Sequence, residues 1–235
     1  MLALPLATIP TIAITGTPGA GKSTAACALA HRLSQLVQPG QAVRYLETGF
    51  WYRVAGWLHA TGQLVWDGSL DLAKLKSFDF KTFLQVPANQ VLIQHPDIDL
   101  PTAWLAQNPE VRGIIAARQQ EVIARPTSKV LVGAGLPGEL NIYLHTDATT
   151  GASRRCQLQR QWGRHVNIAE LERVVALRTE QDAGRANAAV KTVDGGLSID
   201  TTNLTAFEVD ALIWAEVERS INTGRVVLAT QALVH

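Results

Sequence analysis

The sequence predicts an α/β fold in which a parallel sheet is flanked by helices. Three observations predict it. Short apolar strands alternate with helical segments along the chain, a glycine-rich loop joins the first strand to the first helix, and 47% of the residues are hydrophobic. Strands that alternate with helices form parallel sheets, because each helix returns the chain to the same edge. The 235 residues suit one domain with insertions, which we expect over 1–235.

The first strand and helix are the most clearly marked elements. Residues 11–15 are apolar and β-branched, which is typical of a buried strand. Residues 25–37 place Leu29, Leu33 and Leu36 on one face and are predicted to be helical.

The loop between them fits the phosphate-binding pattern G-x-x-x-x-G-K-[ST]. Its residues are Gly16, Thr17, Pro18, Gly19, Ala20, Gly21, Lys22, Ser23 and Thr24. Glycines let successive backbone N–H groups turn toward one phosphate, and the helix N-terminus adds its dipole. Lys22 supplies a positive charge for the β- and γ-phosphates, and the Ser23 hydroxyl is placed for Mg²⁺. We call residues 16–24 the phosphate loop and predict that it binds ATP.

The middle of the chain has a different pattern. A strand is expected over 42–46 and a helix over 50–59. Residues 78–84 then alternate between apolar and polar, 90–95 look similar, and a proline turn lies between them. This pattern predicts an insert of short antiparallel strands over about 61–100.

The second half returns to the α/β pattern. The last helix has a capping box formed by Thr205 and Glu208. The other elements expected are a helix over 102–124 that is broken at 108–109, strands over 129–133, 140–145 and 195–199, and helices over 148–162 and 167–184.

Two further groups of residues indicate chemistry. Glu47, Tyr52 and Arg53 follow a strand end and suit a second phosphate or ribose site, although Tyr52 and Arg53 also fit a helix surface. The second group is rich in arginine: Arg154, Arg155, Arg160, Arg164, Arg173, Arg178 and Arg185. Arginine forks match the oxygens of a phosphoryl group in transfer, and a mobile helix pair could close over it. An exposed helix with i,i+4 ion pairs is the alternative.

Together these pieces resemble the bacterial cytidylate kinases, from about residue 11 to 209. The matching pieces are the phosphate loop; Glu47, Thr48, Gly49, Tyr52 and Arg53; Pro109, Val111 and Arg112; residues 141–144; Arg154 and Arg155; Arg178, Asp182 and Arg185; and residues 199–202. Each piece is short, but their order and spacing agree with the family.

The resemblance implies a P-loop kinase fold with an antiparallel monophosphate-binding insert and a helical, arginine-rich lid over about 150–185. It implies transfer of a phosphoryl group from ATP-Mg²⁺ to a nucleoside monophosphate, with CMP or dCMP expected. Arg53, Arg112 and Arg178 would bind the monophosphate or its base, and Asp182 the ribose hydroxyls. Arg154 and Arg185 would help to clamp the phosphoryl group beside Lys22.

Two departures from the family concern the base. The family carries G-R-D-x-G-T after the third strand, whereas residues 133–138 here read G-A-G-L-P-G. The family serine nine positions before the P-x-V-R arginine is replaced by Ala103, with Thr102 beside it. A base edge loses discrimination when its hydrogen-bond partners are lost. Two alternatives therefore stay open: a kinase for another small acceptor, and a nucleotide-binding protein with little transfer activity.

Composition excludes several other classes. The net charge of +1 gives no bulk attraction to nucleic acid or to a membrane surface. The apolar N-terminus has no basic residue before Lys22, and prolines interrupt it, so we expect neither a secretory signal nor a membrane span. Cys27 and Cys156 are expected to be reduced. We therefore expect a cytoplasmic monomer whose partners are small nucleotides.

Overall fold

The computed structural model describes residues 11–36, 43–65, 70–123, 129–132, 138–183 and 196–223. The chain divides into two compact units. One combines Met1–Leu46 with Pro126–His235 and is called the sheet unit below; the other, Glu47–Arg125, is called the helical unit. The helical unit takes in more of the chain on both sides than the insert expected over 61–100.

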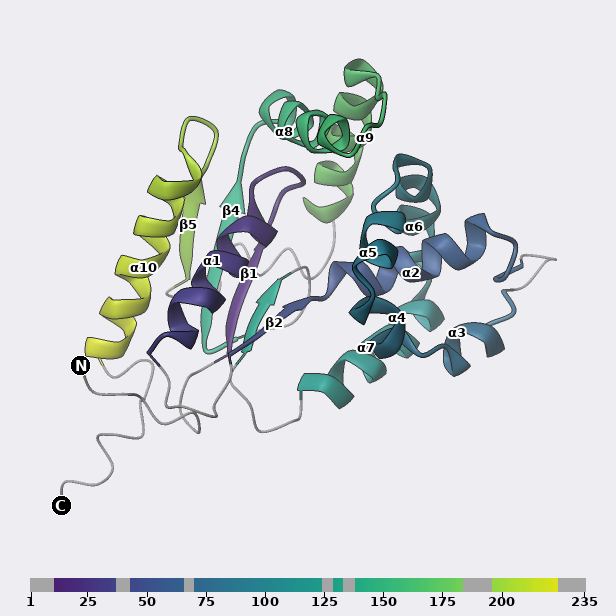
Figure 1. Cartoon of the computed structure of the whole chain (residues 1–235), viewed down its shortest axis with the longest axis horizontal. Helices are drawn as coiled ribbons and strands as arrows, with labels where there is room; N and C mark the ends of the chain where they lie inside the picture. The colour runs from purple at the N-terminus through teal and green to yellow at the C-terminus, as the bar shows by residue number, and fades with distance from the viewer. Residues whose placement is uncertain are drawn as a thin grey trace. The chain divides into compact units, whose positions relative to one another are not determined.

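The described strands form one sheet with the order β2-β3-β1-β4-β5 (Figure 1). Their bounds are β1 (Ile12–Gly16), β2 (Arg44–Glu47), β3 (Lys129–Val132), β4 (Leu140–His145) and β5 (Leu197–Asp200). β1 pairs in parallel with β3 and β4, and β4 pairs in parallel with β5. The expected parallel sheet is confirmed, and the carboxyl ends of β1, β4 and β5 lie at one edge.

The core of the sheet unit explains why its strands are apolar. In β1, Ile12, Ala13 and Ile14 are at most 1% exposed, as expected for a central strand covered on both faces. Helices α1 (Lys22–Ser34) and α10 (Ala206–Asn222) lie side by side against the sheet (Figure 1). Their buried Leu29 and Ile213 belong to the same hydrophobic cluster as the strands.

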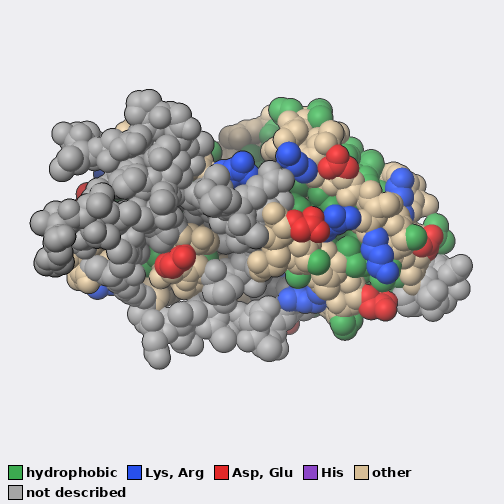
Figure 2. All heavy atoms as spheres, turned by 90° about the horizontal axis from the view of Figure 1, so that it is seen from below, with side chains coloured by type: hydrophobic (Ala, Val, Ile, Leu, Met, Phe, Trp, Pro, Cys, Tyr) green, Lys and Arg blue, Asp and Glu red, His purple; other side chains and the backbone are tan. Residues whose placement is uncertain are grey.

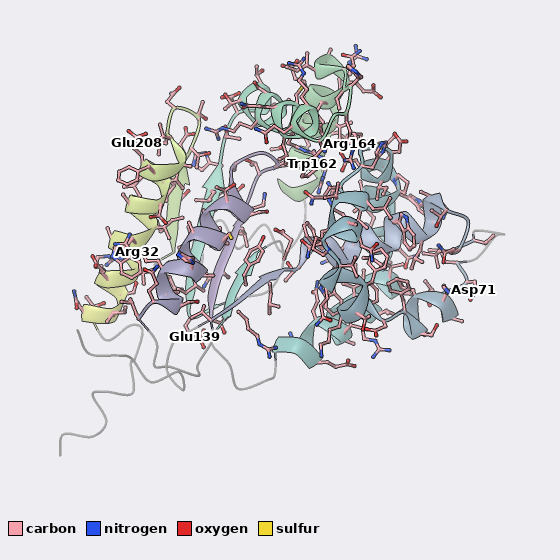
Figure 3. All side chains as sticks on the ribbon, in the orientation of Figure 1. Arg32, Asp71, Glu139, Trp162, Arg164 and Glu208 are labelled. Carbon is pink, nitrogen blue, oxygen red and sulfur yellow. The ribbon has the colours of Figure 1, made fainter. Side chains whose placement is uncertain are left out.

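The capping box of α10 is confirmed. The backbone N–H of Glu208 donates to the Thr205 hydroxyl at 3.3 Å, and the Thr205 N–H donates to the Glu208 carboxylate at 2.8 Å. Arg32 on α1 lies 3.8 Å from the centre of the Trp214 ring on α10 (Figure 3). The contact between Arg32 and Trp214 joins the two helices.

The two expected lid helices are present as α8 (Ala148–Gln161) and α9 (Ile168–Ala183). Ala152 and Cys156 of α8 pack against Leu171 and Val175 of α9 in a small buried cluster. The turn between the helices contains Trp162 and Arg164 (Figure 3).

The helical unit differs from the expected insert. Its elements are α2 (Gly49–Ala60), α3 (Ala73–Ser77), α4 (Phe80–Gln85), α5 (Pro87–Leu92), the 3₁₀ helix η2 (Pro96–Ile98), α6 (Asp99–Leu105) and α7 (Pro109–Ile123). The helix over 102–124 is present with its break before Pro109. The antiparallel strands predicted over 78–84 and 90–95 are wrong, because α4 and α5 occupy those residues.

Local capping explains this difference. The Asp79 carboxylate accepts the Thr82 N–H at 3.1 Å and begins α4, and Pro87 occupies the first turn of α5. The apolar residues of this alternating segment form an aromatic cluster. Phe80 is buried, stacks on Trp51 at 4.9 Å between ring centres, and contacts the edge of Phe78. An aromatic core therefore takes the place of a sheet in this unit.

The surface of the described residues shows neither a membrane-spanning helix nor, on the face in Figure 2, a segregation of charge. Among the described residues, no helix is both long enough and apolar enough to cross a membrane. Basic and acidic side chains are interspersed over the described part of the face shown in Figure 2.

Candidate functional site

The phosphate loop joins the carboxyl end of β1 to the start of α1. Its three glycines have positive backbone φ angles of 141° at Gly16, 79° at Gly19 and 87° at Gly21. Residues with a side chain rarely adopt such angles, so glycine is required by conformation alone. The sequence prediction of a tight glycine turn between strand and helix is confirmed.

Close backbone packing adds a second reason for two of these glycines. A Cβ atom on Gly16 would lie 1.7 Å from the Leu144 carbonyl oxygen of β4. A Cβ atom on Gly19 would lie 2.3 Å from the carbonyl oxygen of Gly151 on α8. The loop is therefore fitted between β4 and α8, and its shape is set by backbone contacts.

The start of α1 provides the chemistry of an anion site. The helix begins at Lys22, and its first turn contains no acidic residue. The first N–H groups of a helix have no partner within the helix and attract negative charge. Ser23 and Thr24 are exposed in this first turn, and the Lys22 ammonium donates to the Thr17 carbonyl oxygen at 2.7 Å. This combination of amides, hydroxyls and an ammonium suits bound phosphate.

The residue that follows β4 holds the phosphate loop by a hydrogen bond. The Thr146 N–H donates to the Thr17 hydroxyl at 3.0 Å. The next residue, Asp147, caps α8 by accepting the Thr150 N–H at 2.7 Å. The hydrogen bonds from the Thr150 backbone and hydroxyl lower the pKa of Asp147. Helix α8, which was predicted to belong to the lid, therefore starts from a fixed position next to the phosphate loop.

The predicted lid arginines occupy different environments. Arg154 donates to the Thr201 hydroxyl at 3.1 Å, to the Thr201 carbonyl at 2.7 Å and to the Leu204 carbonyl at 3.3 Å. Arg178 is half-buried on α9. Asp182 lies on α9, in a part of the helix whose side chains are not described, and Arg185 lies outside the described residues.

Four of the residues predicted to bind the monophosphate belong to the helical unit, whereas Arg178 and Asp182 lie in the sheet unit. Glu47 ends β2, Tyr52 and Arg53 lie on α2, and Arg112 lies on α7. Arg53 donates to the Asp99 carboxylate at 2.6 Å and to the Ile93 carbonyl at 3.0 Å. The Arg53 side chain is 13% exposed and that of Asp99 is 4% exposed, so this is a buried ion pair.

Arg112 and the neighbouring segments are also held by hydrogen bonds. Arg112 donates to the Ala106 carbonyl at 3.3 Å, at the end of α6. The buried Gln119 side chain donates to the Thr48 carbonyl at 2.9 Å and fixes the turn that leads into α2. Both guanidinium groups, of Arg53 and Arg112, thus contact the part of the chain between 93 and 106.

Thr102, which lies beside the position of the family serine, is buried against α2. It is 5% exposed, and its hydroxyl oxygen has no hydrogen-bond partner within the described residues. A Cβ atom on Gly56 would lie 2.3 Å from that oxygen, so Thr102 faces α2. Ala103 is half-buried. The departure at 133–138 lies outside the described residues apart from Gly138.

Three residues that hold the candidate site in place were not predicted from the sequence. Thr201 appeared there only as part of a strand-end motif, and its contacts with residues 20 and 154 are long-range. Gly151 lies within a helix, where a glycine signals close backbone approach, and this signal could have found it. Asp99 carried no sequence signal as the partner of Arg53.

The chain is similar to one protein family and to individual members of it. The family model described as cytidylate kinase matches residues 12–219. A cytidylate kinase from Corynebacterium glutamicum is 30% identical, with 89% of this chain and 96% of that protein covered. A cytidylate kinase from Streptococcus gordonii is 26% identical, with 90% and 97% covered.

Two other matches are to a longer, bifunctional protein and to a solved structure. A bifunctional pantoate ligase/cytidylate kinase from Synechococcus is 30% identical over 86% of this chain, and this chain spans 39% of that longer protein. A crystal structure of a gluconokinase from Sinorhizobium meliloti matches with a TM-score of 0.44 and 14% identity, over 92% of this chain and 95% of the other.

Proposed function

Since the chain belongs to the cytidylate kinase family, we propose that it transfers the γ-phosphoryl group of ATP to CMP or dCMP, giving ADP and CDP or dCDP. The protein is a nucleoside monophosphate kinase, and its substrates are small nucleotides. The observation that most supports the choice of acceptor is the family match, which extends from the phosphate loop into α10.

The ATP site of the proposal is the phosphate loop. The loop is open at Gly21, where nothing lies within 4 Å of the place a Cβ would occupy, and this leaves room for a phosphate group. Its backbone N–H groups would hold the β- and γ-phosphates, and Lys22 would leave the Thr17 carbonyl to neutralise them. Ser23 would hold Mg²⁺, which when bound neutralises charge on the transferring phosphoryl group.

The acceptor site of the proposal uses side chains of the helical unit. Arg53 and Arg112 would bind the monophosphate, with Glu47 and Tyr52 at its edge. Arg53 keeps hydrogen-bonding capacity for a phosphate, because its contacts with Asp99 and Ile93 use two of its five N–H groups. A guanidinium whose plane is already fixed loses less entropy when it binds.

The lid contributes arginines to the transferring group. Arg178 and Arg185 would clamp the phosphoryl oxygens, and Asp182 would accept from the ribose hydroxyls. Arg154 could join the clamp only by leaving its contacts with Thr201 and Leu204. In-line transfer needs no covalent intermediate, so positioning and charge neutralisation are sufficient chemistry for these residues.

The test is a coupled assay of ADP release with CMP, dCMP, UMP, AMP or no acceptor. We expect turnover that depends on CMP or dCMP and is lost in Lys22→Ala. We also expect CMP to be preferred over UMP by less than a hundredfold, which corresponds to about 2.7 kcal/mol. Turnover with none of these nucleotides, in a protein that binds ATP, would contradict the proposal and support a binding protein with little transfer activity.

One observation favours a second candidate, a kinase for another small acceptor. Helices α4 and α5 occupy 80–85 and 87–92, where the resemblance implies antiparallel strands, and Ala103 stands in the place of the family serine. A helical segment there together with a changed base contact suits a different acceptor. ATP-dependent turnover of a non-nucleotide phosphate acceptor, with none for CMP, would favour this candidate.

A further inference from the structure

We propose that Thr201 is a positioning residue of the ATP site, whose hydroxyl fixes one peptide group of the phosphate loop while Arg154 holds that hydroxyl in place. The inference rests on the proposed function in one respect, namely that the loop binds the phosphates of ATP. It gives Arg154 a structural task in place of the clamp role that the resemblance implies.

The geometry joins four segments at one buried hydroxyl. Thr201 follows β5 and is 1% exposed. Its hydroxyl oxygen lies 3.2 Å from the carbonyl oxygen of Ala20 in the phosphate loop and 3.1 Å from that of His145 at the end of β4. The same oxygen accepts a hydrogen bond from Arg154 of α8 at 3.1 Å. Since the Arg154 guanidinium can donate but not accept a hydrogen bond, the hydroxyl proton is left for the carbonyls of Ala20 and His145.

Holding the Ala20 carbonyl also orients an N–H group. The carbonyl of Ala20 and the N–H of Gly21 belong to one trans peptide, so they point in opposite directions. A carbonyl held toward the buried Thr201 therefore leaves the Gly21 N–H directed away from it. This N–H stands directly before α1, among the groups expected to bind phosphate.

The flanking glycine makes such a restraint necessary. Gly21 has a φ of 87°, and nothing lies within 4 Å of the place its Cβ would occupy. A glycine in open space lets the peptide before it rotate with little steric resistance. Without the Thr201 hydroxyl, the Ala20–Gly21 peptide would sample orientations that turn its N–H away from a bound phosphate. Such freedom weakens binding, because it must be lost when the ligand is bound.

Arg154 is fitted to this task by its three contacts. Its guanidinium binds both the hydroxyl and the carbonyl of Thr201, and it reaches the Leu204 carbonyl in the same turn. The N-terminal part of α8, from which it projects, is itself fixed, since a Cβ atom on Gly151 would lie 2.6 Å from the Pro18 carbonyl oxygen.

The first experiment measures the dissociation constant of Mg-ATP by titration calorimetry in Thr201→Val. Valine keeps the shape and removes the hydroxyl, and we expect the constant to rise about tenfold, with the KM for CMP unchanged. Thr201→Ser keeps the hydroxyl and should bind ATP within about twofold of wild type. Thr223→Val removes a hydroxyl that bonds to a carbonyl on α10, and should have no effect. Equal weakening in the serine and valine variants would overturn the proposal, because packing of the methyl group would then explain it.

The second experiment separates the two roles of Arg154. As a positioning residue, Arg154→Ala should weaken Mg-ATP binding, and the double variant with Thr201→Val should be no weaker than the worse single variant. As a clamp, it should lower kcat by about a thousandfold and leave the ATP dissociation constant unchanged. The latter result would overturn our assignment.

The failure of the inference and that of the proposed function are distinguishable. If wild-type protein binds Mg-ATP but does not turn over CMP, the proposed function fails, and the ratio of dissociation constants still decides the role of Thr201. If wild-type protein does not bind Mg-ATP, both are overturned.

Discussion

The candidate phosphate sites of the sheet unit and of the helical unit are built in different ways. In the sheet unit the loop is shaped by backbone: glycines with positive φ angles lie against the backbone of Leu144 and Gly151. In the helical unit the candidate ligand is a side chain, Arg53, whose position depends on the buried Asp99 carboxylate. A site made of backbone is limited by the steric fit of its glycines, whereas a site made of side chains is limited by the pairing of its charges.

The two units are therefore expected to be destabilised by different kinds of substitution. Backbone packing fails sterically, when an atom is added. A buried ion pair fails electrostatically, when one partner is removed and the other is left desolvated.

The largest effect is expected from Gly16→Ala. The added Cβ would lie 1.7 Å from a backbone oxygen at a φ of 141°, so β1 and β4 would have to separate. We expect a loss of at least about 5 kcal/mol in the free energy of unfolding, measured by urea denaturation. The matched control is Gly62→Ala in the helical unit, where φ is 70° and the space is open, with an expected cost of about 1–2 kcal/mol. Equal costs at the two positions would remove the steric basis of the contrast.

A slightly smaller effect is expected from Asp99→Ala. The Arg53 guanidinium would remain buried without its carboxylate, and we expect a loss of about 3–5 kcal/mol in the free energy of unfolding. Hydrogen exchange should show the loss in α2 and α6.

The control for this prediction removes both charges. Arg53→Met combined with Asp99→Leu should recover most of the stability, because apolar pairs of similar volume replace buried ion pairs at little cost. A double variant as unstable as Asp99→Ala would show that the ion pair is not the source of the effect.

The same contrast explains which parts of the molecule could be predicted from sequence. The phosphate loop, the strand 140–145 and the capping box of α10 depend on residues close in sequence, and each was predicted. The strands expected over 78–84 and 90–95 were wrong. That prediction rested on the period-two alternation in 78–84 and gave too little weight to the helix cap at Asp79 and to the proline at the start of α5. Short apolar runs leave helix and strand ambiguous, and tertiary packing around Phe80 decided it.

In the candidate site too, the local motif was predicted from the sequence and the long-range contacts were not. The contact between Thr201 and Ala20 joins residues 181 positions apart, and Arg53 lies 46 positions from Asp99. No local pattern carries such information. Sequence therefore located the phosphate-binding loop but did not identify the residues that hold it and its counterpart in the helical unit.

A smaller effect is expected where the base-reading residues have changed. Ala103→Ser restores the family hydroxyl, and we expect the preference for CMP over UMP in kcat/KM to increase by up to about tenfold. Thr102→Val is the matched control. It removes a buried hydroxyl without a partner among the described residues, so base preference should not change. The free energy of unfolding should change by less than about 1 kcal/mol. A loss of CMP preference in Thr102→Val would mean that Thr102 reads the base.

The smallest effects are expected at two helix caps, where the units should behave alike. Hydrogen bonds from Thr150 lower the pKa of Asp147 in the sheet unit, and hydrogen bonds from Thr82, chiefly those involving its side chain, lower the pKa of Asp79 in the helical unit. A carboxylate with a lowered pKa in the folded state contributes stability above its unfolded pKa, near 3.9. That contribution is lost as the pH falls through the folded pKa.

Asp147→Ala and Asp79→Ala should therefore each lower the thermal unfolding midpoint at pH 7, and the difference from wild type should shrink as the pH is lowered through about 4 and below. Because both caps are local and exposed, the two variants should follow the same pH range in either unit. A difference that persists unchanged at pH 3 would contradict a charge-dependent cap. A shift confined to one variant would show that the caps, like the phosphate contacts, are built differently in the two units.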